Sequence, residues 1–259
     1  TDGTSVSGDG SVVGGSGDTG GYFSYRGYLS VGGSVPGSVG ILPGASDSTI
    51  HSMSANGGVV AGECAVFPYN RAFIAVSGGP LQDLGTFAGG NNARAYGMSG
   101  NGLVAVGVSN GTAGSHAFRW TSAGMQDLGA VPALLSSSAA LATNTDGSVV
   151  VGYNPAASGP WHAAMWTQAL GMVDLNAYLP TLGLNLSGWL LVEAYGVSAD
   201  GRTIAGNAVH NGASEAWVAV LAPLPAPCYA NCDGSTTAPM LNVLDFGCFL
   251  NKFAAGDSY

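Results

Sequence analysis

The sequence predicts an all-β fold, and two observations support that prediction. The chain has 259 residues, of which 43 are glycine and only 8% are charged, against about 25% charged residues in an ordinary soluble domain. This composition suits short strands joined by tight turns, whereas exposed helix surfaces need Glu, Lys and Arg. The second observation is a turn pattern that recurs along most of the chain.

Five Asx-Gly turns mark the repeat. They are Asp9-Gly10, Asn56-Gly57, Asn101-Gly102, Asp146-Gly147 and Asp200-Gly201, at spacings of 47, 45, 45 and 54 residues. Asn-Gly and Asp-Gly tolerate positive φ at both central positions, so each pair predicts a type I′ hairpin turn. Each turn is followed by a short run rich in small and β-branched residues, typical of a strand.

Further strands complete each repeat. A third strand is expected around Tyr28, Phe73, Phe118, Trp166 and Trp217, and a fourth around Asp83, Asp127 and Asp174. Four short antiparallel strands at this period indicate the blades of a β-propeller. We therefore predict a five-bladed β-propeller over residues 1–221, with repeats at about 1–45, 46–90, 91–134, 135–183 and 184–221. An open solenoid or an irregular sandwich is the alternative.

The fifth repeat differs from the others at its end. It runs into a proline-rich stretch over residues 222–227, which we interpret as a stiff linker because proline cannot donate to a strand ladder. The fifth blade would then lack its fourth strand and leave an exposed edge. Either the N-terminal stretch Thr4–Ser7 or a loop covers this edge, or an extended segment of a neighbouring subunit pairs with it.

Residues 228–259 carry the one pattern that suggests a metal site. Oxygen-bearing side chains alternate through a glycine-containing turn and then precede an apolar helix, which is the order of a calcium loop. The predicted ligands are Asn231, Asp233, Ser235, the backbone of Met240, Asn242 and Asp245. Two carboxylates and a three-residue insertion predict weak calcium binding in the extracellular range. Without metal, Asn242 could simply cap the helix.

The four cysteines favour an oxidising compartment. Cys232 and Cys248 flank the calcium loop and helix, so we expect a disulfide between them, and Cys228 would then pair with Cys64 or with another chain. A zinc site is disfavoured because the C-x3-C-x15-C spacing has no second pair and no nearby histidine.

Two stretches carry a resemblance to known families. Residues 115–129, with 96–102 before them, resemble the HAF repeat of bacterial extracellular proteins. The C-terminal segment, with its Asn-Cys-Asp-Gly-Ser-Thr-Thr run starting at Asn231, resembles the dockerin-like ending of planctomycete GC-type dockerin-anchored proteins. In such proteins two loop-helix units pack on each other, so the single unit here resembles half a dockerin. The resemblance implies a secreted or cell-surface bacterial protein and supplies no catalytic activity.

Composition and motifs exclude several functions. With 6 Lys+Arg and a net charge of −9, the chain cannot neutralise several phosphates of a nucleic acid. No apolar run reaches the roughly 20 residues of a membrane span.

His116 and His162 occupy a repeat position that varies between blades, so we interpret them as solvated strand residues. Asp83, Asp127 and Asp174 recur, which indicates a turn or a blade-to-blade hydrogen bond.

The leading hypothesis is a secreted, non-catalytic surface or matrix scaffold. Its calcium-binding C-terminal segment would mediate docking to a cohesin-like or other surface partner, or self-assembly of the chain, including into a polymer. The alternatives are a carbohydrate-binding propeller that stacks sugars on Trp120, Trp166 and Trp217, or a subunit of an extracellular polysaccharide-degrading complex.

Overall fold

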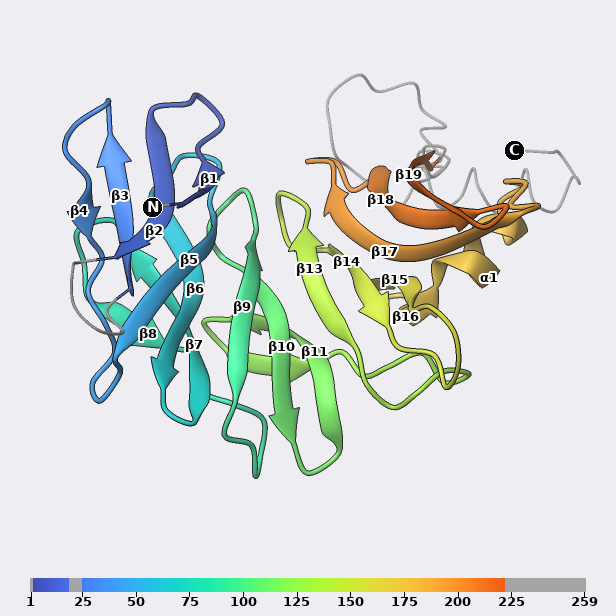
Figure 1. The fold of residues 1–259 in the computed structure, drawn as a ribbon, viewed down its shortest axis with the longest axis horizontal. Helices are drawn as coiled ribbons and strands as arrows, with labels where there is room; N and C mark the ends of the chain where they lie inside the picture. The colour runs from blue at the N-terminus through green and yellow to red at the C-terminus, as the bar shows by residue number, and fades with distance from the viewer. Residues whose placement is uncertain (1, 19–24, 222–259) are drawn as a thin grey trace, which may run out of the picture. The chain divides into compact units, whose positions relative to one another are not determined.

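The computed structural model describes residues 2–18 and 25–221. The chain divides into two compact units, Thr1–Val220 and Leu221–Tyr259, and nearly all of the second lies outside the described residues. Within the described part, strands form five antiparallel sheets, which we number 1 to 5 in chain order (Figure 1). The predicted all-β fold is confirmed.

Every sheet keeps its strands in chain order, so each consecutive pair is a hairpin. Sheet 1 contains β1 (Asp2–Val6), β2 (Val12–Asp18), β3 (Tyr25–Val31) and β4 (Gly37–Ser38), and sheet 2 contains β5 (Asp47–Met53), β6 (Val59–Val66), β7 (Tyr69–Val76) and β8 (Leu81–Asp83). Sheet 3 contains β9 (Ala93–Met98), β10 (Ala105–Gly111), β11 (Gly114–Thr121) and β12 (Gly124–Asp127), and sheet 4 contains β13 (Ala139–Thr143), β14 (Val149–Asn154), β15 (His162–Thr167) and β16 (Gly171–Asp174).

Sheet 5 is the exception, because its described residues form three strands. These are β17 (Trp189–Val197), β18 (Thr203–His210) and β19 (Ala213–Val220), with β19 at the edge. The N-terminal stretch does not cover this edge, since β1 pairs with β2 in sheet 1. That expectation for Thr4–Ser7 is therefore wrong, and no described strand pairs with the outer side of β19.

The core consists of apolar layers between consecutive sheets. Phe73 and Ile50 of sheet 2 are fully buried against sheet 1, and Phe118 of sheet 3 is fully buried against sheet 2. Trp120 belongs to the layer between sheets 2 and 3, and Trp166 to the layer between sheets 3 and 4. Each sheet is thus covered by its neighbours in chain order, as the repeat predicts.

One glycine in the second strand of every sheet is fixed by a close backbone approach. These glycines are Gly15, Gly62, Gly107, Gly152 and Gly206. A Cβ on Gly107 would lie 1.9 Å from the carbonyl oxygen of Arg94 on the neighbouring strand. The register between β9 and β10 shifts at this same residue. The recurring glycine therefore lets the second strand pass a bulged first strand, a role that only a residue without Cβ can fill.

We expect Gly107→Ala to lower the free energy of unfolding by about 2 kcal/mol or more, because backbone must move to admit the methyl group. Gly196→Ala is the matched control, since Gly196 also lies in a strand but has no atom within 4 Å of an added Cβ. Urea unfolding of both variants measures the difference. Equal stability of the two variants would contradict this account of the glycine.

The five Asx-Gly turns differ from the predicted type I′ geometry. Gly10 has a φ of 73°, but Asp9 does not share a positive φ, and the other four turns are alike in this respect. The Asp9 carboxylate accepts the hydroxyl of Ser7 at 2.7 Å and the backbone N–H of Ser11 at 3.0 Å. These bonds hold the residue before glycine at negative φ, so the type I′ prediction is wrong. A turn with both residues at positive φ occurs instead at Asn211-Gly212, between β18 and β19.

Hydrogen bonds in these turns lower the pKa of their carboxylates. The N–H of Ser11 and the hydroxyls of Ser7 and Ser11 lower the pKa of Asp9 to about 2. The pKa values of Asp146 and Asp200 are lowered in the same way by bonds from neighbouring serines and backbone. Asn56 and Asn101 make equivalent bonds without titrating.

The triple substitution Asp9→Asn, Asp146→Asn and Asp200→Asn should therefore flatten the acid dependence of stability. Because the folded pKa lies below the unfolded value, each carboxylate stabilises the fold above pH 3.8 and loses that effect as pH falls through its lowered pKa, which for Asp9 is about 2. Urea unfolding across this pH window should show a smaller loss for the triple variant than for the wild type. Equal losses would contradict the assignment.

One element was not predicted. The helix α1 (Leu175–Thr181) follows β16, with Asp174 as its N-cap and Leu175 and Leu179 fully buried. The i, i+4 spacing of these leucines is the sequence signal that was missed. No helix among the described residues is long and apolar enough to span a membrane.

Candidate functional site

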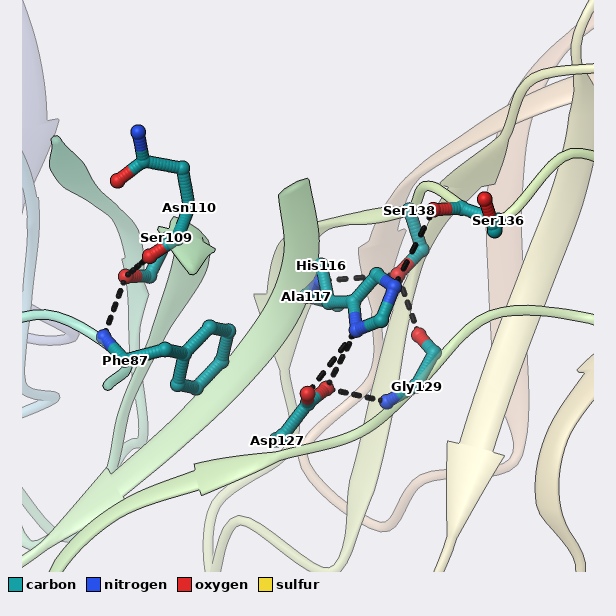
Figure 2. A network of polar contacts seen from close by, with 9 residues as sticks. All are labelled: Phe87, Ser109, Asn110, His116, Ala117, Asp127, Gly129, Ser136 and Ser138. Atoms are coloured by element: carbon teal, nitrogen blue, oxygen red, sulfur yellow. Dashed lines mark hydrogen bonds and ion pairs between the residues drawn. The ribbon is translucent and has the colours of Figure 1, made fainter. Parts of the chain in front are cut away.

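The recurring histidine and aspartate positions meet in one polar network in sheet 3 (Figure 2). His116 on β11 points toward Asp127 on β12, and its Nδ1 lies 2.9 Å from Asp127 Oδ2. Its Nε2 lies 3.2 Å from the carbonyl oxygen of Ser136. Asp127 also accepts the backbone N–H of Gly129 at 2.7 Å. The pair therefore joins two strands and closes the turn after the second.

Ser138 connects this network to the next sheet (Figure 2). Its hydroxyl accepts the backbone N–H of Ala117 at 2.8 Å and donates to the carbonyl oxygen of Gly129. Ser48 makes the corresponding bonds between sheets 1 and 2, to Gly27 and Gly40. Buried N–H groups on the third strands are thus bonded by a serine in or directly before the first strand of the following sheet.

The same arrangement appears in sheets 2 and 4. Arg71 Nη2 lies 2.7 Å from Asp83 Oδ2, and His162 Nδ1 lies 2.7 Å from Asp174 Oδ2. Asp83 and Asp174 each accept the backbone N–H two residues further on, as Asp127 does. The interpretation as turn residues is therefore confirmed for Asp83 and Asp127, whereas Asp174 caps the helix that follows it.

The interpretation of the histidines as solvated strand residues is wrong for His116. This residue is only 9% exposed, and both ring nitrogens face acceptors. Sequence variation at this position does not imply solvation, because arginine and histidine can both pair with the aspartate across the ladder. No described group of three or more His, Cys, Asp or Glu side chains could hold a metal ion.

We expect the more buried of these pairs to contribute more to the free energy of unfolding. The Asp174 side chain is 14% exposed and also caps α1, whereas the Asp83 side chain is 36% exposed. We expect Asp174→Ala to cost about 2 kcal/mol and Asp83→Ala less than about 1 kcal/mol. Thermal and urea unfolding of the two variants test the order, and a larger effect at Asp83 would contradict it.

A second polar cluster lies between sheets 2 and 3. Glu63 on β6 lies 3.0 Å from Arg94 Nε on β9 and 3.5 Å from His51 Nε2 on β5. Tyr96 contacts the His51 ring edge-on, with centroids 5.5 Å apart. Burial acts to lower the pKa of Arg94, but the hydrogen bond with Tyr96 and the charge of Glu63 outweigh it, so the pKa is raised. An acid already paired with arginine is poorly placed to act as a proton donor or acceptor.

A third cluster involves the first strand of sheet 5. Glu193 accepts hydrogen bonds from the Tyr195 hydroxyl and from Asn207 Nδ2. The bond to Glu193 raises the pKa of Tyr195 to about 12, so its phenol stays protonated at neutral pH. In sheet 4, Tyr153 stacks on Trp161 with centroids 4.3 Å apart. The cluster around Glu193, like the other two, ties neighbouring strands together.

The predicted calcium ligands lie outside the described residues, as do Cys228, Cys232 and Cys248. Calcium binding and both disulfides therefore stay predictions. Cys64 is fully buried on β6 in the layer between sheets 1 and 2. This burial raises the pKa of its thiol to about 11.

Comparison with known proteins identifies the fold class. No family model and no curated protein matches the sequence. The structure is similar to TolB from Acinetobacter baumannii, with a TM-score of 0.56 and 11% identity over 83% of this chain and 50% of that chain. It is also similar to a putative TolB from Agrobacterium tumefaciens, with a TM-score of 0.53 and 12% identity over 83% of this chain and 74% of that chain.

At this identity the likeness concerns the fold alone, and the chain spans about half the length of the first of these proteins. Together with the face-to-face packing of the sheets, it confirms the predicted β-propeller. The described part of the chain is a β-propeller array of five sheets.

Proposed function

We propose that this protein is a secreted, non-catalytic scaffold. One observation carries the proposal: the acidic and histidine side chains that recur in the described sheets are bonded to neighbouring strands. Asp83, Asp127 and Asp174 each pair with an arginine or histidine side chain and accept a hydrogen bond from the backbone N–H two residues further on. Side chains used in this way stabilise the propeller and leave its surfaces to act in binding.

The burial of three tryptophans argues against the lectin alternative. Trp120 is 9% exposed, and Trp166 and Trp217 are each 6% exposed. A sugar needs an open aromatic face for stacking, and these three indoles already pack within the sheets. Their burial supports a packing role and favours a scaffold over a sugar-binding propeller.

In this proposal the C-terminal segment provides the docking function. The spacing of Asn231, Asp233, Ser235, Asn242 and Asp245 supports a calcium loop. The ion would order this segment and expose the apolar residues of the following helix to another copy or to a cohesin-like surface partner. A cell-surface or extracellular location fits this function, because millimolar calcium there would fill a weak site.

The test is the mass of the full chain in solution, measured by light scattering with calcium and with a chelator. We expect chelation to lower the mass of the wild type, and Asp245→Ala to show the lower mass even with calcium, because the loop loses one of its two carboxylates. Asp18→Ala, outside the loop, serves as the control and should behave as the wild type does. Equal masses under all conditions would contradict calcium-dependent assembly.

A further inference from the structure

The first sheet leaves uncovered a face that every other sheet buries. Three residues after each turn glycine, the second strand carries a side chain that faces the preceding sheet. At this position Val60 is 1% exposed, Ala105 0%, Val150 1% and Ile204 0%, whereas Val13 of sheet 1 is 45% exposed. Val60 packs with residues of sheet 1, which fixes the direction of this face. Sheet 1 has no preceding sheet among the described residues.

A shallow hollow marks this face of sheet 1. It has a volume of about 230 Å³ and is lined by Val13, Gly15, Tyr28 and Ser30, among others. Tyr28 and Ser30 are the cross-strand partners of Gly15 and Val13, so the four residues share one face of the sheet. We call this surface the leading face.

Sheet 5 leaves the opposite face uncovered. On the third strand, Ala72, Ala117 and Ala163 are 0% exposed, whereas the matching Ala216 is exposed. Two residues further on, Ile74 is 9% and Met165 2% exposed, but Val218 is 66% exposed.

This face points toward the following sheet, because Ala72 and Ile74 pack with residues of sheet 3. Ala205, the cross-strand partner of Val218, belongs to the same surface. We call the surface formed by Ala205, Ala216 and Val218 the trailing face.

Figure 1 shows sheets 1 and 5 at the two ends of the row of sheets. Every packed layer inside the row joins the trailing face of one sheet to the leading face of the next. The two uncovered surfaces are therefore the two halves of the interface that the chain already forms between its own sheets.

We propose that the trailing face of sheet 5 binds the leading face of sheet 1 in a second copy of this chain. The proposal rests on the self-assembly part of the proposed function and names its surface and its partner. Val13, Tyr28 and Ser30 on one side and Ala205, Ala216 and Val218 on the other carry no charge. Bringing them together removes apolar surface from water. Asp2 also lines the hollow and is exposed, so the contact keeps its carboxylate hydrated at the rim.

The contact is head-to-tail, so it leaves one leading and one trailing face free at the ends of any dimer. Such an interface closes into a ring or continues as a filament, depending on the rotation between copies. A second copy is favoured over closure within one chain, because the described residues contain both faces and leave both exposed.

Arginine substitutions test each face separately in the full chain. Val218→Arg places a charge on the trailing face, and Val13→Arg places one on the leading face. Val76→Arg is the control, since Val76 is exposed to a similar 62% but belongs to neither face. Sedimentation velocity in a chelator removes any calcium-dependent contact from the measurement.

In the chelator, we expect the wild type and Val76→Arg to gain mass as concentration rises. Val218→Arg alone and Val13→Arg alone should each stay monomeric. An equimolar mixture of Val218→Arg and Val13→Arg should form heterodimers and grow no further, because it holds one intact face of each kind. Heterodimer formation also shows that both variants are folded.

Two outcomes would overturn the proposal. One is a wild type that stays monomeric at all concentrations in the chelator. The other is association that survives in both arginine variants, which would place the contact at the free edge of β19. A failure of the calcium-dependent docking appears separately, as equal masses with calcium and with chelator.

Discussion

The structure depends on the burial of sheet faces by neighbouring sheets. A four-stranded sheet of strands with two to eight residues cannot form a core alone, so its stability comes from the layers beside it. Phe73, Phe118 and Trp166 each fill one such layer. This dependence explains why the repeat is so regular in its interior and why it becomes irregular at its ends.

The recurring polar residues serve the same packing. Close contact between sheets buries backbone N–H groups on the third strands, and these need partners. Ser48 and Ser138 supply them across the layers, while Asp83, Asp127 and Asp174 close the turns. Recurrence of a polar residue in a repeat protein is therefore compatible with a structural role.

The sequence predicted the fold class and the positions of the hairpins, because these depend on local patterns. The Asx-Gly pairs marked where chains reverse, and the valine-rich runs marked the second strands. The turn type was missed because the Asp9 carboxylate takes up the bonds of Ser7 and Ser11 and holds a conformation that the dipeptide alone does not specify. The pairing of His116 with Asp127 depends on cross-strand register, which the repeat pattern could not resolve.

The glycine at each second strand shows how a repeat protein can be both regular and extendable. Gly62, Gly107 and Gly152 allow every sheet to have the same bulged first strand, and so every sheet presents the same two faces. Equivalent faces make any two sheets potential neighbours, whether they belong to one chain or to two. Natural arrays of this kind need a cap or a partner at each end, since an uncovered apolar face favours association. The exposure of Val13 and Val218 indicates that the described part of this chain has no cap at either end.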